Sequence, residues 1–155
     1  MIEIALYQPD IAPNAAAILR LAACFGLTVR IIEPAGFVWG DARFRRAGMD
    51  YLDHVTVIRA PSWESFRTAT AGRRIVLMTT KVEQFHHRFG FETNDIILMG
   101  RESAGVPEFV HRAVDARLAI PMQPGLRSLN VAVACAIAVS EALRQTGGFA
   151  APNNS

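Results

Sequence analysis

Short apolar runs rich in β-branched residues alternate with longer helical patterns along the whole chain. The apolar runs, which predict strands, cover Ile2–Tyr7, Thr28–Glu33, His54–Arg59, Arg74–Thr79, Asp95–Gly100 and Ala116–Ile120. The helical patterns cover Pro13–Phe25, Asp41–Ala47, Ser62–Ala69, Pro107–Ala113 and Leu129–Thr146. Strands that alternate with helices predict an α/β domain built around a largely parallel sheet.

The predicted strands end in segments rich in Gly, Pro, Asn, Ser and Thr, where an open α/β sheet binds its ligands. These segments are Gln8–Asn14, Thr79–Lys81, Gly100–Gly105 and Pro121–Ser128. The first of them contains no glycine, so neither a G-x-G-x-x-G turn nor a phosphate-binding loop follows the first strand. This argues against a nucleotide-binding Rossmann domain and against a flavodoxin-like binding module.

The segment Ile120–Asn130 is a loop crowded with turn residues, and it runs into an apolar helix. Ser128 is a candidate N-cap for that helix. Val131–Val139 consists of small apolar residues with no polar face, so we expect this part of the helix to be buried all round. A polar loop fixed to a buried helix predicts a binding site.

A second loop, Gly100–Pro107, places Glu102 between two glycines that would let the backbone approach a ligand closely. The alternative is a surface turn with a solvated carboxylate. Arg20 lies among alanines at helical spacing, so it either extends to solvent or meets a ligand or partner, and a guanidinium suits phosphate or carboxylate. Asn14, beside Pro13, is on local grounds an N-cap.

The segment Asp41–Tyr51 combines Arg43, Arg45 and Arg46 with the aromatic ring of Tyr51. Basic side chains interleaved with aromatic rings suit an RNA backbone and unstacked bases. A solvated amphipathic turn is the alternative, and it is the commoner explanation for a run of charge.

Composition narrows the class of protein without naming a function. The chain has 155 residues and a net charge of +2, which alone does not argue for nucleic acid. No apolar run approaches the ~20 residues of a membrane span, and Met1–Tyr7 lacks a basic signal-peptide region. Cys24 and Cys135 both lie in apolar helical segments, so we expect buried thiols in a cytoplasmic protein and no cysteine nucleophile. His86 and His87 are adjacent and point apart, so no metal site is expected.

Three motifs, in this order, resemble the SpoU-type branch of the SPOUT RNA 2′-O-methyltransferases. They are Pro13-Asn14 with Ile18-Leu-Arg20, the segment Ile97–Pro107, and Ile120-Pro-Met through Ser128-Leu-Asn130 with its apolar helix. Ile32–Phe37 and Arg45–Tyr51 look like the single-domain members that methylate the wobble nucleotide of certain leucine tRNAs. The similarity covers nearly the whole chain.

The resemblance implies a single SPOUT domain over residues 1–147, a frayed tail over 148–155 and a deep C-terminal trefoil knot. It also implies S-adenosyl-L-methionine as cofactor, a homodimer, and a tRNA anticodon stem-loop as partner. Cofactor contacts would fall at Met78, Gly100, Ile120 and Ser128, with Thr80, Glu102 and Met122 adjacent. The reactive cluster would comprise Asn14, Arg20, Glu102, Ser128 and Asn130.

One departure from the family pattern concerns the nucleotide preference. Close members often carry Thr-Gly-Asn after Pro-Asn, whereas Asn14 is followed here by three alanines, so a polar contact at position 17 is lost. Two alternatives stay open at this point. One is the same methylation on another RNA, such as rRNA, and the other is a knotted RNA-binding protein without turnover.

Overall fold

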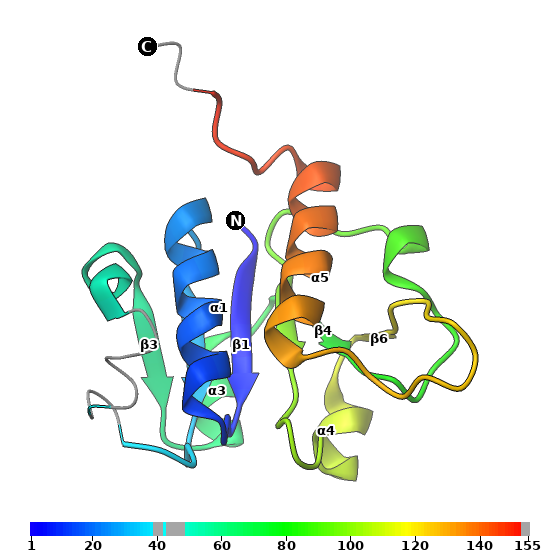
Figure 1. Cartoon of the computed structure of the whole chain (residues 1–155), viewed down its shortest axis with the longest axis horizontal. Coiled ribbons are helices and arrows are strands. Elements are labelled where there is room, and N and C mark those ends of the chain that lie inside the picture. The colour runs from blue at the N-terminus through cyan, green and yellow to red at the C-terminus, as the bar shows by residue number, and fades with distance from the viewer. Residues whose placement is uncertain (39–41, 43–48, 153–155) are drawn as a thin grey trace.

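The computed structural model describes residues 1–38, 42 and 49–152, and within them six parallel strands form one sheet. The strands are β1 Glu3–Tyr7, β2 Val29–Ile32, β3 Val57–Ala60, β4 Ile75–Met78, β5 Ile96–Met99 and β6 Ala116–Leu118. Their spatial order is β3-β2-β1-β5-β4-β6, so β1 and β5 lie at the centre (Figure 1). The six predicted strands and the parallel sheet are confirmed, with ends shifted by a few residues.

Helices cover both faces of this sheet. They are α1 Ala12–Phe25, α3 Trp63–Ala69, α4 Glu108–Ala113 and α5 Val131–Thr146, with short 3-10 helices η1 Met49–His54 and η2 His86–Arg88. Four predicted helices are confirmed, and the fifth, Asp41–Ala47, falls largely outside the described residues. His54, which we expected in a strand, belongs to η1.

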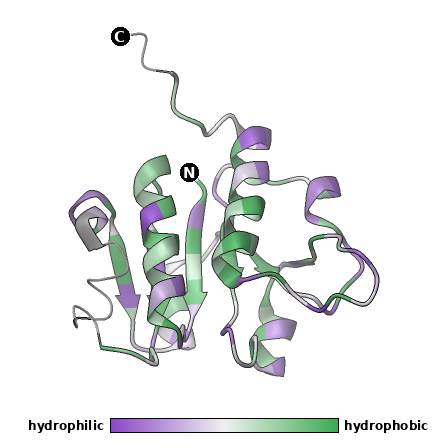
Figure 2. Cartoon of the chain, in the orientation of Figure 1, coloured by the Kyte–Doolittle hydropathy of each residue, from purple (hydrophilic) through white to green (hydrophobic). Residues whose placement is uncertain are grey.

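Alternate side chains of β1, β4 and β5 enter two separate cores. In β1, Ile4 and Leu6 pack with α1 and α5, whereas Ala5 and Tyr7 pack with α3 and α4. The central strand β5 is 0–3% exposed along its whole length, because a parallel sheet with helices on both faces has no solvent-facing side. Figure 2 shows that hydrophobic residues make up much of α1 and the first turns of α5. The carboxyl ends of the strands are left as the edge where a polar site can form.

Helix α1 ends where its sequence predicts, but it does not begin as predicted. Gly26 adopts φ +67° and closes the helix through hydrogen bonds from its N–H to Ala22 and Ala23. At the other end the N-cap is Ile11, with no capping side chain. The interpretation of Asn14 as an N-cap is therefore wrong. Asn14 lies inside the first turn, so its side chain is available for a contact elsewhere.

Helix α5 begins at Val131, and its N-cap is Asn130 rather than Ser128. The Asn130 Oδ1 accepts hydrogen bonds from the backbone N–H of Ala132 (2.9 Å) and of Val133 (3.3 Å). The expectation that Val131–Val139 is buried on every side is also wrong within the single chain. Val133 is 48% exposed, whereas Cys135 is fully buried. One face of α5 packs on the sheet and α1, and part of the other faces outward.

The remaining expectations concern the thiols and the tail. Cys135 is buried as expected, whereas Cys24 is exposed, because α1 turns that position away from the sheet.

In the tail, Gly148 donates to the Leu143 carbonyl (2.9 Å), and Phe149 packs edge-on against Phe25 at 5.6 Å. Among the described residues, no helix is long and apolar enough to cross a membrane.

Candidate functional site

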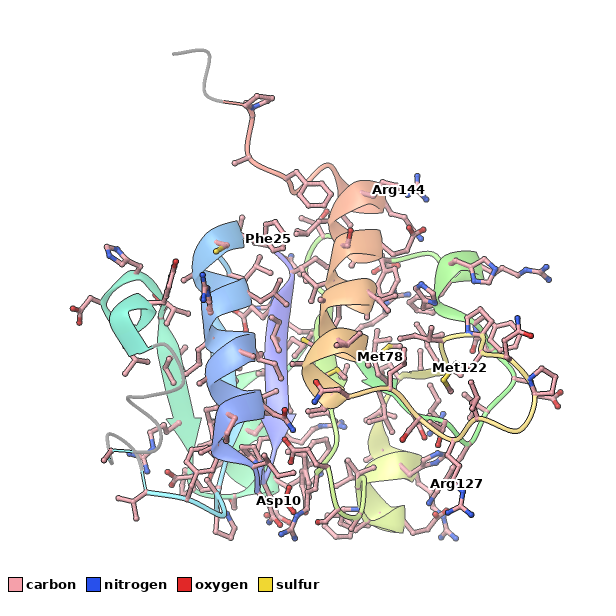
Figure 3. All side chains as sticks on the ribbon, in the orientation of Figure 1. Asp10, Phe25, Met78, Met122, Arg127 and Arg144 are labelled. Atoms are coloured by element: carbon pink, nitrogen blue, oxygen red, sulfur yellow. The ribbon has the colours of Figure 1, made fainter. Side chains whose placement is uncertain are left out.

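A cavity of about 510 Å³ opens where β4, β5 and β6 end. Its walls are the loops that follow these three strands, together with the first turns of α1 and α5. Figure 3 places Met78, at the end of β4, near Met122 in the loop after β6, and both side chains line the cavity. Three of the four strand-end segments singled out in the sequence therefore meet in one hollow, with the fourth segment contributing Asn14.

All seven residues expected at a cofactor line this cavity. They are Met78, Thr80, Gly100, Glu102, Ile120, Met122 and Ser128. Their convergence follows from the topology, since parallel strands bring their carboxyl ends to the same edge of a sheet. Contact between these residues and a cofactor stays a prediction.

The structure brings together four of the five residues expected to form the reactive cluster. Asn14, Glu102, Ser128 and Asn130 line the cavity, and the Asn130 Nδ2 donates to the Asn14 Oδ1 at 2.9 Å. One side chain thus caps α5 and ties it to α1. The fifth residue, Arg20, is not among the lining residues.

Arg20 is exposed further along α1, and its guanidinium lies over the ring of Tyr51 at 4.8 Å from the ring centroid. A cation over an aromatic face is held there electrostatically. Tyr51 was expected to stack on RNA bases, but within this chain Arg20 covers one face of its ring. The other residues of that expected surface, Arg43, Arg45 and Arg46, lie outside the described residues.

The loop after β5 is closed by its own backbone. Arg101 and Gly105 exchange two backbone hydrogen bonds of 2.9 Å, and Gly105 adopts φ +63°. A Cβ at Gly100 would lie 2.8 Å from the Gly105 carbonyl carbon, so position 100 must be glycine. This close approach is between two parts of one loop, whereas the sequence suggested an approach to a ligand. The tight turn directs Glu102 into the cavity wall.

Glu102 meets a second carboxyl group that the sequence analysis did not single out. The backbone N–H of Asp10 donates to the Glu102 Oε2 at 3.2 Å, and this bond holds the two carboxyl groups beside each other. Burial and then the contact with Asp10 raise the pKa of Glu102. The same contact, aided by Ser103 and Arg101, lowers the pKa of Asp10. The sequence contained one indication that Asp10 could lie near Glu102. Asp10 follows β1, Glu102 follows β5, and these two strands are neighbours in the sheet.

Comparison with known proteins places this architecture in one family. The model of the SpoU rRNA methylase family matches residues 1–140. The chain belongs to this family. A tRNA (cytidine(34)-2′-O)-methyltransferase from Ancylobacter novellus is 55% identical over 151 residues, which are 96% of this chain and 96% of that protein.

Two solved structures show the same fold at lower identity. A structure described as giving insight into the 2-OH methylation of C/U34 on tRNA is 38% identical, with TM-score 0.89, and the match covers 94% of this chain and 95% of that chain. An AdoMet-bound rRNA methyltransferase from Sinorhizobium meliloti is 25% identical, with TM-score 0.83, over 92% of this chain and 56% of that one. The predicted family and its α/β architecture are confirmed.

For a SpoU methylase of this kind, the chain presents a formed cavity and a separate arginine. The cavity contains amide and carboxyl groups from Asn14, Glu102 and Asn130, whereas Arg20 is paired with Tyr51 elsewhere on α1. Among the described residues, no group of three His, Cys, Asp or Glu side chains could hold a metal ion. The amide and carboxyl groups of the cavity can hydrogen-bond and orient a ligand.

Proposed function

We propose that this protein transfers a methyl group from S-adenosylmethionine to the ribose 2′-hydroxyl of the wobble nucleotide, cytidine or uridine, of tRNA. The observation that carries the proposal is the cavity at the strand ends, which brings together residues from each of the three family motifs, with Asn14 alone from the first. It is supported by 55% identity over 96% of the chain to a tRNA (cytidine(34)-2′-O)-methyltransferase. A leucine tRNA anticodon stem-loop is the proposed substrate.

The cavity suits such a cofactor in both size and chemistry. Its volume of about 510 Å³ falls within the range of small-molecule sites. Met78, Ile120 and Met122 supply apolar surface for a purine, and Glu102 and Asn130 supply polar groups. S-adenosylmethionine would supply a methyl group on a sulfonium, which is electrophilic without further activation. The protein's main task is then to align the ribose hydroxyl with that methyl group.

Arg20 is the proposed aid to the attacking hydroxyl. A guanidinium stays protonated in proteins, so abstraction of the hydroxyl proton by Arg20 is unfavourable. Its positive charge can instead lower the pKa of the hydroxyl or hold the adjoining phosphate. Comparing Arg20→Lys with Arg20→Ala tests this, because a specific guanidinium role is wrong if lysine preserves kcat.

We also propose a homodimer in which Arg20 of one copy serves the cavity of the other. In support, Val133 and Leu129 at the start of α5 are 48% and 38% exposed, and Ile11 beside α1 is 42% exposed. Pairing of these faces across a two-fold axis would cover them. A monomer at low micromolar concentration in analytical ultracentrifugation would contradict the dimer.

Co-expression of two inactive variants tests the shared site directly. Arg20→Ala and Glu102→Gln each remove a different half of the proposed site. If the site is shared, a random mixture of the two chains restores roughly a quarter of the wild-type sites, because half of the dimers are mixed and each has one intact site. If both residues act within one chain, the mixture stays inactive.

The trefoil knot is likewise proposed for this chain. Family membership supports it, as does the close apposition of the chain segments after β4 and β6. Thr79 donates to the Leu118 carbonyl and Ala119 donates to the Gln84 carbonyl, both at 2.8 Å. The cavity lies against these neighbouring segments, so they would fix its shape.

One assay separates the proposed activity from its rivals. The protein is incubated with tritiated S-adenosylmethionine and with total tRNA or rRNA from a strain that lacks this protein. The position of the transferred methyl group is then determined by nucleoside mapping. We expect label at the 2′-oxygen of nucleotide 34 in leucine tRNA. Label in rRNA alone would assign another substrate, and absence of both cofactor binding and label would indicate an RNA-binding protein without turnover.

A further inference from the structure

The loop after β1 and the loop after β5 are joined by a compact polar cluster at the edge of the cavity. Besides the contact between Asp10 and Glu102, the Ser103 hydroxyl donates a hydrogen bond to the Asp10 Oδ2. The Arg101 guanidinium lies 3.9 Å from the same oxygen and also reaches the Gln8 Oε1 at 3.4 Å. Three consecutive residues of one loop thus converge on a single aspartate.

The backbone at Asp10 has little freedom to move away from this loop. Gly36, in the segment after β2, donates its N–H to the Pro9 carbonyl at 2.8 Å. A Cβ at Gly36 would lie 2.8 Å from the Cα of Asp10, so the two segments are in direct backbone contact. The backbone at Asp10 is therefore held in place by the segment after β2, and contacts from Asp10 can restrict the movement of the loop Gly100–Gly105.

We propose that Asp10 is a positioning residue that shares one proton with Glu102 and thereby fixes the loop Gly100–Gly105 against the segment leading into α1. This deepens the proposed function and rests on it in one respect, namely that Glu102 lines the cofactor cavity. The same segment continues into Asn14, which is bonded to Asn130 on α5. Asp10 therefore links the Glu102 wall of the cavity to the Asn14–Asn130 wall.

Two carboxyl groups in contact cannot both be ionised without repulsion, so a shared proton is what allows the contact. The Asp10 Oδ1 is buried and receives no hydrogen bond from another donor among the described residues, so a proton on Glu102 is the partner that would satisfy it. The charged group nearest the pair is Arg101, on the same loop. Lys81 and His111 contribute to other walls of the cavity.

The pH dependence follows from the direction of the shifts. Since the pKa of Asp10 is lowered and that of Glu102 is raised in the folded protein, the pair holds a single shared proton between these two pKa values. It is lost as pH rises through the folded-state pKa of Glu102, when both carboxylates become charged. We expect the loop to loosen and cofactor affinity to fall over that interval.

Two substitutions at Asp10 separate positioning from general destabilisation. Asp10→Ala removes the contact, whereas Asp10→Asn supplies an amide that donates to an ionised Glu102 without a shared proton. Asp53→Asn, at an exposed carboxylate in η1, is the matched control. One readout is amide hydrogen exchange at Arg101 and Gly105, whose N–H groups close the loop. The other is the calorimetric affinity for S-adenosylhomocysteine between about pH 5 and pH 9.

We expect Asp10→Ala to lower exchange protection of both amides, and the affinity, by about tenfold, the effect of one lost buried partner. Near neutral pH, Asp10→Asn should retain the wild-type exchange protection and the wild-type affinity. It should also make the affinity less dependent on pH. Unchanged protection in Asp10→Ala would overturn the proposal, as would a wild-type pH profile in Asp10→Asn. If even the wild-type protein fails to bind the ligand, the proposed function fails, whereas the exchange data still decide the role of Asp10.

Discussion

The side chain of Asn130 connects the two helices at the cavity, and its removal gives a quantitative test of the structure. Its Oδ1 caps α5 through two backbone N–H groups, and its Nδ2 donates to Asn14. Loss of a side-chain N-cap costs about 1 kcal/mol. The bond to Asn14 is exposed, so about 0.5 kcal/mol is appropriate for it. Asn130→Ala should therefore lower the free energy of unfolding by about 1.5 kcal/mol.

Two further variants divide this value into its parts. Asn130→Ser keeps a capping oxygen but does not reach Asn14, so it should cost only about 0.5 kcal/mol. Asn14→Ala should be nearly neutral, because the lost bond is offset by the better helix propensity of alanine. The double-mutant cycle of the two alanine variants should give a coupling energy of about 0.5 kcal/mol.

The assay is urea unfolding followed by circular dichroism at one fixed protein concentration, since the stability of a dimer depends on concentration. If Asn130→Ala were as stable as wild type, the capping role assigned to Asn130 would be wrong. If Asn130→Ala and Asn130→Ser were equally destabilised, the cap would contribute nothing beyond the contact with Asn14.

Three other predictions concern charges and thiols. Asp95 is 1% exposed and accepts two hydrogen bonds from Arg74. Asp95→Ala should therefore lower the free energy of unfolding by about 3 kcal/mol in the same urea assay, and a decrease of less than about 1 kcal/mol would contradict this. Native protein treated with iodoacetamide should be modified at the exposed Cys24 and not at Cys135, whose pKa burial raises to about 12; peptide mapping checks this, and equal labelling would refute it. Hydrogen bonds from Arg144 and then Gln145 lower the pKa of Glu141 to about 2, so its stabilising contribution should persist above the unfolded value and fade as pH falls toward 2. A carboxyl NMR titration should show this low pKa, and Arg144→Ala should move it back toward 4.5.

The elements were predictable from the sequence where burial on both faces dictates composition. Ile75–Met78 and Ile96–Met99 are continuous apolar runs because helices cover both sides of the sheet. The convergence of their carboxyl ends at one cavity then followed from parallel topology alone. For this reason the segments Thr79–Lys81, Gly100–Gly105 and Pro121–Ser128 could be placed together before any coordinates, whereas Met78 and Ile120 were expected at the cofactor only from the family resemblance.

The details of capping and of side-chain pairing depend on contacts distant in sequence. Ser128 and Asn130 are both good N-cap residues, and local sequence does not choose between them. A contact 116 residues away, with Asn14, accompanies the choice of Asn130. Likewise, Asp10 and Glu102 are 92 residues apart, so neither composition nor spacing could pair them.

The separation of Asn14 and Arg20 follows from helix geometry and bears on how the site is completed. Six residues along an α-helix advance it by about 9 Å and leave the two side chains roughly 120° apart around the axis. One α1 therefore cannot direct both residues into the same cavity. In this chain Asn14 faces the cavity, whereas Arg20 faces Tyr51 on η1. If both residues act in one methyl transfer, the arginine must come from the α1 of a second copy. Helix geometry then predicts that dimers formed from Arg20→Ala and Glu102→Gln chains regain activity.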